Sequence, residues 1–237
     1  MIDFHCHILP AIDDGSSGIE ESIKLLAMER DDGVDRLVLT PHFYAEKDGK
    51  GYFNKREKRY MQLLEAMEGA GSGIGDIQVK LGAEVCYFPG CGEADIMDQL
   101  CINEGRYLLL EMPFMQWDKN MVSDVEDLIE KRDIRLIIAH IERYFPYQKD
   151  MSYWNEVFSM PVIPQMNAGA FIGKWLKRRR SFKLLNQGHE IVLGSDCHNV
   201  VSRRPNITSG RREIAAKLGK SFVLTMDKRA EVLFEQL

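Results

Sequence analysis

The chain has 237 residues, of which 45% are hydrophobic and 28% are charged, and its formal net charge is −5. This length and composition suffice for one large α/β domain, or two small ones, with a sizeable core. The net negative charge argues against a global attraction to nucleic acid. Residues 174–180 form one locally basic run, which is typical of a solvated helix face. We therefore predict no nucleic-acid partner.

The five cysteines are scattered and show none of the Cys-x-x-Cys spacings of zinc sites. This pattern indicates reduced thiols in a cytosolic protein rather than a disulfide framework. The start of the chain lacks the basic and apolar regions of a secretory signal. No apolar run approaches the roughly 18 residues needed to cross a bilayer. We expect a cytoplasmic protein that is not inserted in a membrane.

The opening stretch, MIDFHCHILPAIDDG, places two histidines at the end of an apolar segment. Residues 1–6 are predicted to form a buried strand, which Pro10 and Gly15 turn into a loop. In extended backbone His5 and His7 point the same way. Two carboxylates, Asp13 and Asp14, follow on the loop. Imidazole pairs next to carboxylates indicate a divalent metal site.

The same pattern recurs along the chain, because apolar runs of strand length end in residues that can bind metal or phosphate. These runs span residues 36–42, 79–84, 107–111, 135–140, 162–167 and 191–198. The residues at their ends are His42, Glu84, Glu111, His140, Asn167, Asp196 and His198. Amphipathic helices are predicted between or after them, over residues 18–33, 54–71, 119–133, 209–219 and 227–237. The glycine-rich stretch 69–76 is predicted to be a flexible connection.

Seven strand-like runs that alternate with helices predict repeated βα units. Polar groups at nearly every strand end favour a (β/α) barrel, in which the carboxyl ends converge on one face. A doubly wound open sheet is the alternative, and it would gather ligands at a single switch point. No linker or second domain is evident, so residues 1–237 are predicted to form one domain.

Five of the six histidines lie at predicted strand ends, and only His189 lies elsewhere. With four carboxylates they provide nine donors, about the number that two or three metal ions share. The nine are His5, His7, Asp14, His42, Glu84, Glu111, His140, Asp196 and His198. Mixed imidazole and carboxylate donors favour Mn, Zn or Fe. Cys6 and Cys197 alternate with these residues, so they are expected to face the other way as buried thiols.

The motifs DFHCHILPAIDDG, TPHF, GAEV, LLLEMPF, AHIERY and GSDCHN resemble, in order, those of the PHP (polymerase and histidinol phosphatase) superfamily of metal-dependent phosphoesterases. More closely, the chain resembles the bacterial PHP-type protein-tyrosine phosphatases of capsule and exopolysaccharide clusters. The resemblance runs from Ile2 to about Pro205, and HCHILPAIDDG and AHIERY are its most specific parts. It implies a distorted (β/α)7 barrel with a trinuclear site, usually manganese-dependent, at the carboxyl ends of the strands.

The resemblance also implies roles for individual residues. His5, His7, Glu84 and Asp196 would hold one metal, and Glu84 would bridge to a second metal that Glu111 and His140 also hold. Asp14, His42 and His198 would hold the third. Asp14 rather than Asp13 takes the family's position, although the sequence alone does not decide between them. Arg143 matches a phosphate-binding arginine. Arg203 matches a second by its spacing, and Arg204 competes with it because the stretch reads Ser-Arg-Arg-Pro. Gln165 and Asn167 would lie around the metal ligands or at the rim.

The implied reaction is hydrolysis of phosphotyrosine in a protein by metal-activated hydroxide, without a covalent enzyme intermediate. The implied partner is an autophosphorylated tyrosine kinase of capsule or exopolysaccharide synthesis. A homo-oligomer is compatible with the sequence, which does not reveal the oligomeric state.

Three other interpretations stay open at the level of sequence. The stretch from Cys197 to Arg203 has the Cys-x5-Arg spacing of thiolate phosphatases, but its loop lacks the glycine that a tight phosphate cradle requires. Related PHP proteins hydrolyse small phosphomonoesters such as histidinol phosphate or nucleotides. Finally, the barrel could be a binding module without catalysis, although its complete donor set argues against this.

Overall fold

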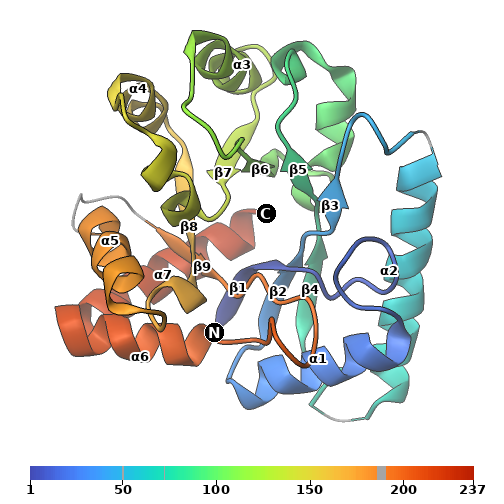
Figure 1. Ribbon diagram of the computed structural model, residues 1–237. Coiled ribbons are helices and arrows are strands. Elements are labelled where there is room, and N and C mark those ends of the chain that lie inside the picture. The colour runs from blue at the N-terminus through green and yellow to red at the C-terminus, as the bar shows by residue number, and fades with distance from the viewer. Residues whose placement is uncertain (50, 72, 186–190) are drawn as a thin grey trace.

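Parallel strands and helices alternate along the chain (Figure 1). The computed structural model describes residues 1–49, 51–71, 73–185 and 191–237. His189 and Ser72 of the glycine-rich stretch lie outside the described residues. The strands are β1 (Ile2–Cys6), β2 (Arg36–Leu39), β3 (His42–Phe43), β4 (Gln78–Leu81), β5 (Glu84–Cys86), β6 (Tyr107–Glu111), β7 (Arg135–Ile138), β8 (Ile163–Asn167) and β9 (Val192–Gly194).

Two of the predicted strands are interrupted. Thr40 and Pro41 separate β2 from β3, and Gly82 and Ala83 separate β4 from β5. Two hydrogen bonds hold the broken strands side by side across the gap: the Gly82 N–H donates to the Leu39 carbonyl oxygen at 2.8 Å, and the Glu84 N–H donates to the Pro41 carbonyl oxygen at 2.9 Å. Each interrupted pair therefore occupies one place in the sheet.

The strands curl into a ring in the order β1, β2/β3, β4/β5, β6, β7, β8, β9, and every neighbouring pair is parallel. The ring closes between β9 and β1. There the Asp196 N–H donates to the His5 carbonyl oxygen at 2.7 Å, and the His7 N–H donates to the Cys197 carbonyl oxygen at 2.9 Å. The predicted distorted (β/α)7 barrel is confirmed, and the open doubly wound sheet is not the fold of this chain.

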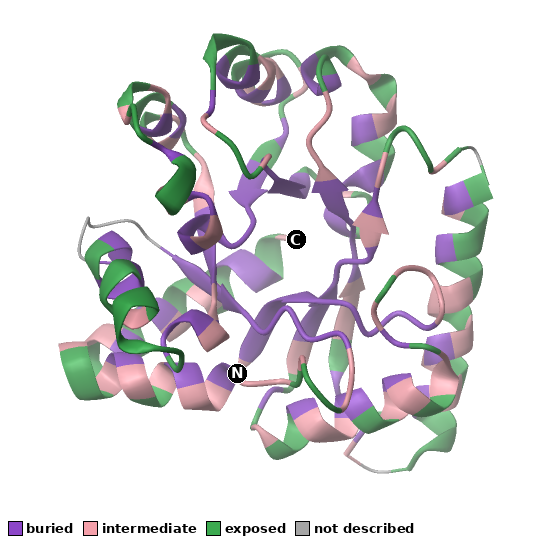
Figure 2. Ribbon diagram, viewed as in Figure 1, coloured by how far each residue is buried: buried purple, intermediate pink, exposed green. Residues whose placement is uncertain are grey.

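Most of the helices surround the ring, with their exposed faces outward, and the last helix crosses behind it (Figure 2). They are α1 (Ile19–Asp31), α2 (Gly51–Gly69), α3 (Lys119–Glu130), α4 (Ser152–Ser159), α5 (Trp175–Leu185), α6 (Ile207–Leu218) and α7 (Lys220–Gln236). The sequence did not indicate α4. It placed the start of α7 at residue 227, whereas this helix begins at Lys220. Short 3-10 turns follow several strands, including η4 (Ile141–Arg143), η5 (Phe145–Tyr147) and η6 (Ala168–Ala170). Among the described helices, none is both long and apolar enough to cross a membrane.

The last helix packs against the interior of the barrel. Phe4, Val38, Ile137 and Val192 from the strands form one buried cluster with Phe234 of α7. The Phe4 and Phe234 rings meet edge to face with centroids 6.5 Å apart. Full burial of such a side chain stabilises a fold by about 1.5–3 kcal/mol. The helix thus supports the strands on which the polar groups stand.

The contact between α6 and η6 leaves no room for an added side chain. A Cβ on Gly210 would lie 2.6 Å from the Ala168 carbonyl oxygen and 2.7 Å from the Ala168 Cβ. Overpacking of this kind costs about 1–3 kcal/mol. We predict that Gly210→Ala lowers the urea midpoint of unfolding. Gly69→Ala is the control, because nothing lies within 4 Å of its added Cβ. Equal midpoints for the two variants would contradict this packing.

Candidate metal centre

The nine predicted donor residues gather at the carboxyl ends of the strands. His5 and His7 come from the end of β1, His42 begins β3, and Glu84 begins β5. Glu111 ends β6, whereas His140, Asp196 and His198 lie on the loops that follow β7 and β9. Four groups of three or four of these residues have ligand atoms within 4.8 Å of one another. These groups could hold metal ions.

Backbone strain turns two of these residues toward the centre. His140 has a φ of 26° and Asp196 a φ of 53°, values that are uncommon for residues other than glycine. Each residue lies two positions after the last residue of its strand, Ile138 of β7 and Gly194 of β9. A glycine allows the neighbouring close approach, because a Cβ on Gly194 would lie 2.5 Å from the His5 Cβ.

The hydrogen bonds around His5 assign its tautomer. Gln165 Oε1 accepts the backbone N–H of His140 at 2.7 Å, which identifies this atom as the amide oxygen. His5 Nδ1 lies 3.0 Å from the same oxygen and must therefore be the donor. His5 Nε2 is left with a lone pair that faces the centre. Gln165, which the sequence placed around the ligands, thus positions His5.

Asp13 orients the ring of His7 in the same way as Gln165 orients the ring of His5. Asp13 Oδ2 lies 2.8 Å from His7 Nδ1 and also accepts the backbone N–H of His42. Although burial alone would raise the pKa of the Asp13 carboxyl, its hydrogen bonds with His7, His42 and Gly15 bring that pKa down to about 2. The carboxylate therefore accepts and His7 Nδ1 donates, so that His7 Nε2 carries the lone pair when the ring takes the neutral form that binds metal.

These two lone pairs converge on a single point with two carboxylates. His5 Nε2 and His7 Nε2 are 3.1 Å apart. Glu84 Oε2 lies 3.2 Å from each, and Asp196 Oδ1 lies 3.7 Å from His5 Nε2 and 3.6 Å from His7 Nε2. When both rings are neutral, these four electron-rich atoms repel one another, and a divalent cation removes that repulsion. The residues present fit such an ion.

Glu84 lies at the middle of the whole arrangement. Its Oε1 is 2.8 Å from His140 Nε2, and its Oε2 is 3.0 Å from His42 Nδ1. Glu111 Oε1 is 3.4 Å from the same His140 nitrogen. Burial opposes ionisation of Glu84, but the surrounding histidines hold its pKa well below the ordinary value. A fully buried carboxylate that contacts four imidazoles is suited to bridge two ions.

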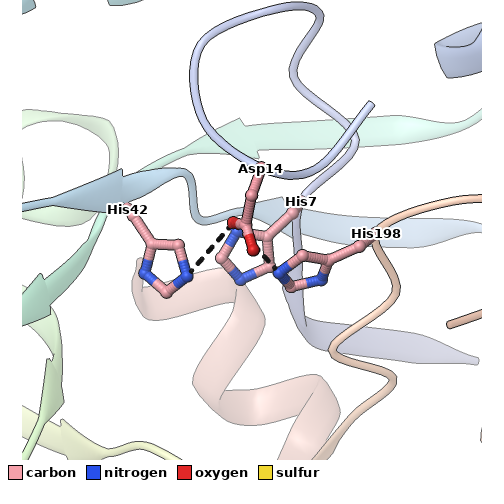
Figure 3. Close-up of side chains that lie close together, drawn as sticks. All are labelled: His7, Asp14, His42 and His198. Atoms are coloured by element: carbon pink, nitrogen blue, oxygen red, sulfur yellow. Dashed lines mark ion pairs between the residues drawn. The ribbon is translucent and has the colours of Figure 1, made fainter. Parts of the chain in front are cut away.

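A further group consists of His7, Asp14, His42 and His198 (Figure 3). Asp14 Oδ1 lies 3.5 Å from Nε2 of both His42 and His198. His198 Nδ1 donates to the Asp196 carbonyl oxygen at 3.1 Å, so its buried Nε2 carries a lone pair, for which the described residues provide no hydrogen-bond partner. Burial, assisted by the positive charge of His7, lowers the pKa of His198 to about 4. A neutral imidazole is the form that binds metal.

The structure distinguishes the two aspartates and the two arginines that the sequence left open. Asp14 faces the ring nitrogens, whereas Asp13 binds His7 Nδ1 and the backbone N–H of His42 from outside the cluster. Arg203 Nη2 donates to Asp196 Oδ1 at 2.7 Å. Arg204 instead donates to the Val201 carbonyl oxygen on an exposed loop. Their roles toward metal and phosphate stay predictions.

Arg143 lies on the other side of Asp196. Its Nη1 is 3.4 Å from Asp196 Oδ2, and its guanidinium lies over the Phe114 ring at 4.9 Å from the centroid. Arg143 and Arg203 have about two-fifths of their side-chain surface exposed, at 39% and 40%. Both guanidinium groups can therefore reach a ligand above the cluster. Phe114 ends the motif LLLEMPF, but the sequence assigned it no role, because its ring reaches the centre only through the loop after β6.

Cys6 and Cys197 face away from the metal centre, as the alternation predicts. Cys6 Sγ donates to the Val38 carbonyl oxygen, and Cys197 Sγ lies 3.5 Å from Glu29 Oε1. The Cys197 side chain is fully buried. It lies on the opposite side of the chain from Asp196, the carboxylate that Arg203 contacts. This geometry argues against the thiolate interpretation.

Sequence reasoning missed Asp3, whose Oδ1 accepts the backbone N–H of both His5 and Ser195 and so ties β1 to β9.

The comparison with protein families finds one family whose model covers nearly the whole chain. The family described as capsular polysaccharide synthesis, CpsB/CapC, matches residues 1–232. This chain belongs to the CpsB/CapC family. The prediction from the sequence motifs is therefore confirmed at the level of the family.

Individual relatives match over most or all of their length. The tyrosine-protein phosphatase CpsB of Streptococcus pneumoniae is 29% identical over 254 residues, which covers 100% of both chains. The tyrosine-protein phosphatase YwqE of Bacillus subtilis is 25% identical and covers 98% of this chain and 91% of its own. A solved structure from work on YwqE and CpsB, described as metal-dependent tyrosine phosphatases, superposes with a TM-score of 0.83 at 23% identity. It covers 100% of this chain and 95% of that chain, and it establishes the shared fold.

The central position of Glu84 in this CpsB/CapC chain leads to a test of the ligand hierarchy. Glu84→Ala removes a carboxylate that contacts four imidazoles, whereas His42→Ala removes one ring from a partly open group. We predict that the Glu84 variant, purified in the presence of Mn²⁺ and desalted, retains fewer metal ions per chain by elemental analysis. Circular dichroism verifies that both variants are folded. Equal metal losses would show that Glu84 does not bridge.

Proposed function

We propose that this protein is a metal-dependent phosphatase that hydrolyses phosphotyrosine in proteins. The observation that carries the proposal is the convergence of His5 Nε2, His7 Nε2, Glu84 and Asp196 beneath two partly exposed arginines. The relatives named as tyrosine-protein phosphatases support the choice of substrate. Small phosphomonoesters such as histidinol phosphate or a nucleotide are the second candidate.

The nine donors would hold two or three divalent ions, and Mn²⁺ suits their mixture of imidazole and carboxylate better than Mg²⁺ does. His5, His7, Glu84 and Asp196 would hold one ion, Glu84, Glu111 and His140 the second, and Asp14, His42 and His198 the third, as their mutual distances allow. When bound, such ions neutralise phosphoryl oxygens and supply a nucleophile near neutral pH. Gln165 and Asp13 keep the lone pairs of His5 and His7 directed at the ions.

The two arginines would hold the phosphoryl group from opposite sides. Arg143 approaches Asp196 Oδ2 from η4, and Arg203 approaches Oδ1 from the loop after β9. The planar guanidinium group can donate two hydrogen bonds to the non-bridging oxygens of a phosphate. These hydrogen bonds strengthen as negative charge develops on the oxygens. The Phe114 ring stacks at 17° on His140 and lies beneath Arg143. It offers an apolar face to the phenyl ring of a phosphotyrosine.

We propose further that residues 1–237 act as one domain in the cytoplasm. The family match over residues 1–232 and a continuous barrel core support a single domain. All five cysteines are free, as is usual in a reducing compartment. The proposed physiological substrate is an autophosphorylated tyrosine kinase of capsule or exopolysaccharide synthesis.

A turnover panel tests the function. Metal-stripped protein is reconstituted with Mn²⁺ or Mg²⁺ and offered a phosphotyrosyl peptide, a phosphoseryl peptide, histidinol phosphate and a cyclic nucleotide. We predict no turnover after stripping, greater recovery with Mn²⁺ than with Mg²⁺, and the highest kcat/KM for the phosphotyrosyl peptide. Preference for histidinol phosphate would favour the second candidate. Full activity without metal would contradict both.

The arginines allow a separate test with a matched neighbour. Loss of one charged hydrogen bond at a partly desolvated site lowers kcat/KM by about 30- to 1000-fold. We predict this loss for Arg143→Ala and Arg203→Ala with metal content unchanged. Arg204→Ala should cost far less, because its guanidinium contacts the exposed Val201 carbonyl oxygen. A damaging Arg204→Ala together with a silent Arg203→Ala would reverse the assignment.

A further inference from the structure

A large cleft adjoins the metal centre on the side of α5. It has a volume of about 940 Å³ and is lined by residues from η4, η5 and the amino-terminal part of α5, together with Phe114. Its wall includes the basic run that the sequence analysis interpreted only as a solvated helix face. Four cations line it, Arg143, Lys174, Lys177 and Arg180.

Three of these cations lack a close anionic partner. Within the described part of the chain, no carboxylate lies within 4 Å of Lys174, Lys177 or Arg180. Their neighbour Arg178 differs, because it forms an ion pair with Glu213. Glu142 is the acidic residue of the wall, but it is buried and accepts the backbone N–H of Asn167. The open face of the cleft is therefore cationic.

The same cleft exposes large apolar side chains. Trp175 is 68% exposed, Leu176 is 62% exposed and Tyr147 is 47% exposed. The Arg179 guanidinium lies 5.5 Å from the centroid of the Trp175 ring. Exposed aromatic rings beside cations are typical of binding surfaces rather than of inert protein surface. The cations and the exposed apolar side chains together suit a peptide that carries several carboxylate side chains.

The cleft and the metal centre share two residues. Arg143 lines the cleft and contacts Asp196 at 3.4 Å, and Phe114 lines the cleft and stacks on His140. A phosphoryl group held by Arg143 thus lies at one end of the cleft. The polypeptide that carries this group can continue past Tyr147 toward α5.

We propose that this cleft binds an acidic segment of the phosphopeptide next to the phosphotyrosine and so determines which proteins are dephosphorylated. The inference rests on the proposed function for the identity of the phosphorylated residue. Lys174, Lys177 and Arg180 pair with carboxylates of the segment, and Trp175 and Tyr147 cover its apolar atoms. Phosphotyrosine without a peptide chain does not reach these residues.

Matched substrates and variants test the proposal. Two phosphotyrosyl peptides differ only in carrying glutamates or glutamines on both sides of the phosphotyrosine, and free phosphotyrosine is the third substrate. The variant is Lys177→Gln/Arg180→Gln. The control, Lys58→Gln/Lys228→Gln, removes the same charge from exposed positions on α2 and α7 outside the cleft. Kinetics are measured at low ionic strength, where such charges act most strongly.

For the wild-type protein we expect a kcat/KM about 10-fold higher with the glutamate peptide than with the glutamine peptide, mainly through KM. The cleft variant should lose this preference and keep its activity on free phosphotyrosine, and the control should behave as the wild type. Equal kcat/KM values for both peptides on the wild type, or the same loss in the control, would overturn the proposal.

A binding measurement separates this inference from the proposed function. The fluorescence anisotropy of a labelled, unphosphorylated glutamate peptide reports on the cleft without any turnover. Binding that the cleft variant loses supports the acidic segment even if no phosphotyrosyl substrate is hydrolysed. Absence of binding to the wild-type protein, together with equal hydrolysis of both phosphopeptides, would leave the proposed function intact. It would refute the proposal that the cleft binds an acidic segment.

Discussion

The structure depends on two imidazole lone pairs that are forced to face each other. His5 Nε2 and His7 Nε2 lie 3.1 Å apart, and in the neutral rings both nitrogens carry lone pairs, because Gln165 and Asp13 bind the hydrogens on the opposite sides of the rings. Glu84 adds negative charge at the same point. Such an arrangement is unfavourable unless a cation occupies the point where the atoms converge. The donors thus define the chemistry of the centre before any comparison with another protein.

The barrel holds this arrangement by closing at β1 and β9. Asp3 binds the backbone of His5 and of Ser195, and the Asp196 N–H donates to the His5 carbonyl oxygen. The close contact at Gly194 lets these strands approach. On the opposite end of the barrel, α7 packs Phe234 against Phe4. The strands therefore form the base of the centre, and the segments beyond them carry Arg143, Arg203 and the wall of the cleft.

Much of the fold could be predicted, because buried parallel strands are short apolar runs that end in polar residues. The strand β6 coincides with its predicted range, and the donor residues stand out because most histidines of the chain lie at such ends. The breaks after Leu39 and Leu81 were not predicted, since the apolar pattern runs across them and only the three-dimensional path of the chain separates the pieces. Local sequence also could not reveal the tautomers of His5 and His7, the choice between Asp13 and Asp14, or the contact of Phe114 with Arg143. Each of these depends on partners that are distant in sequence or on loop geometry.

Anomalous X-ray scattering at the manganese edge tests the central claim most directly. Crystals of the wild-type protein grown with Mn²⁺ would locate each ion without reference to activity. The account predicts a peak among His5 Nε2, His7 Nε2, Glu84 and Asp196, and further peaks beside His140 and beside His198. Well-ordered crystals in saturating Mn²⁺ with no peak between His5 and His7 would contradict it.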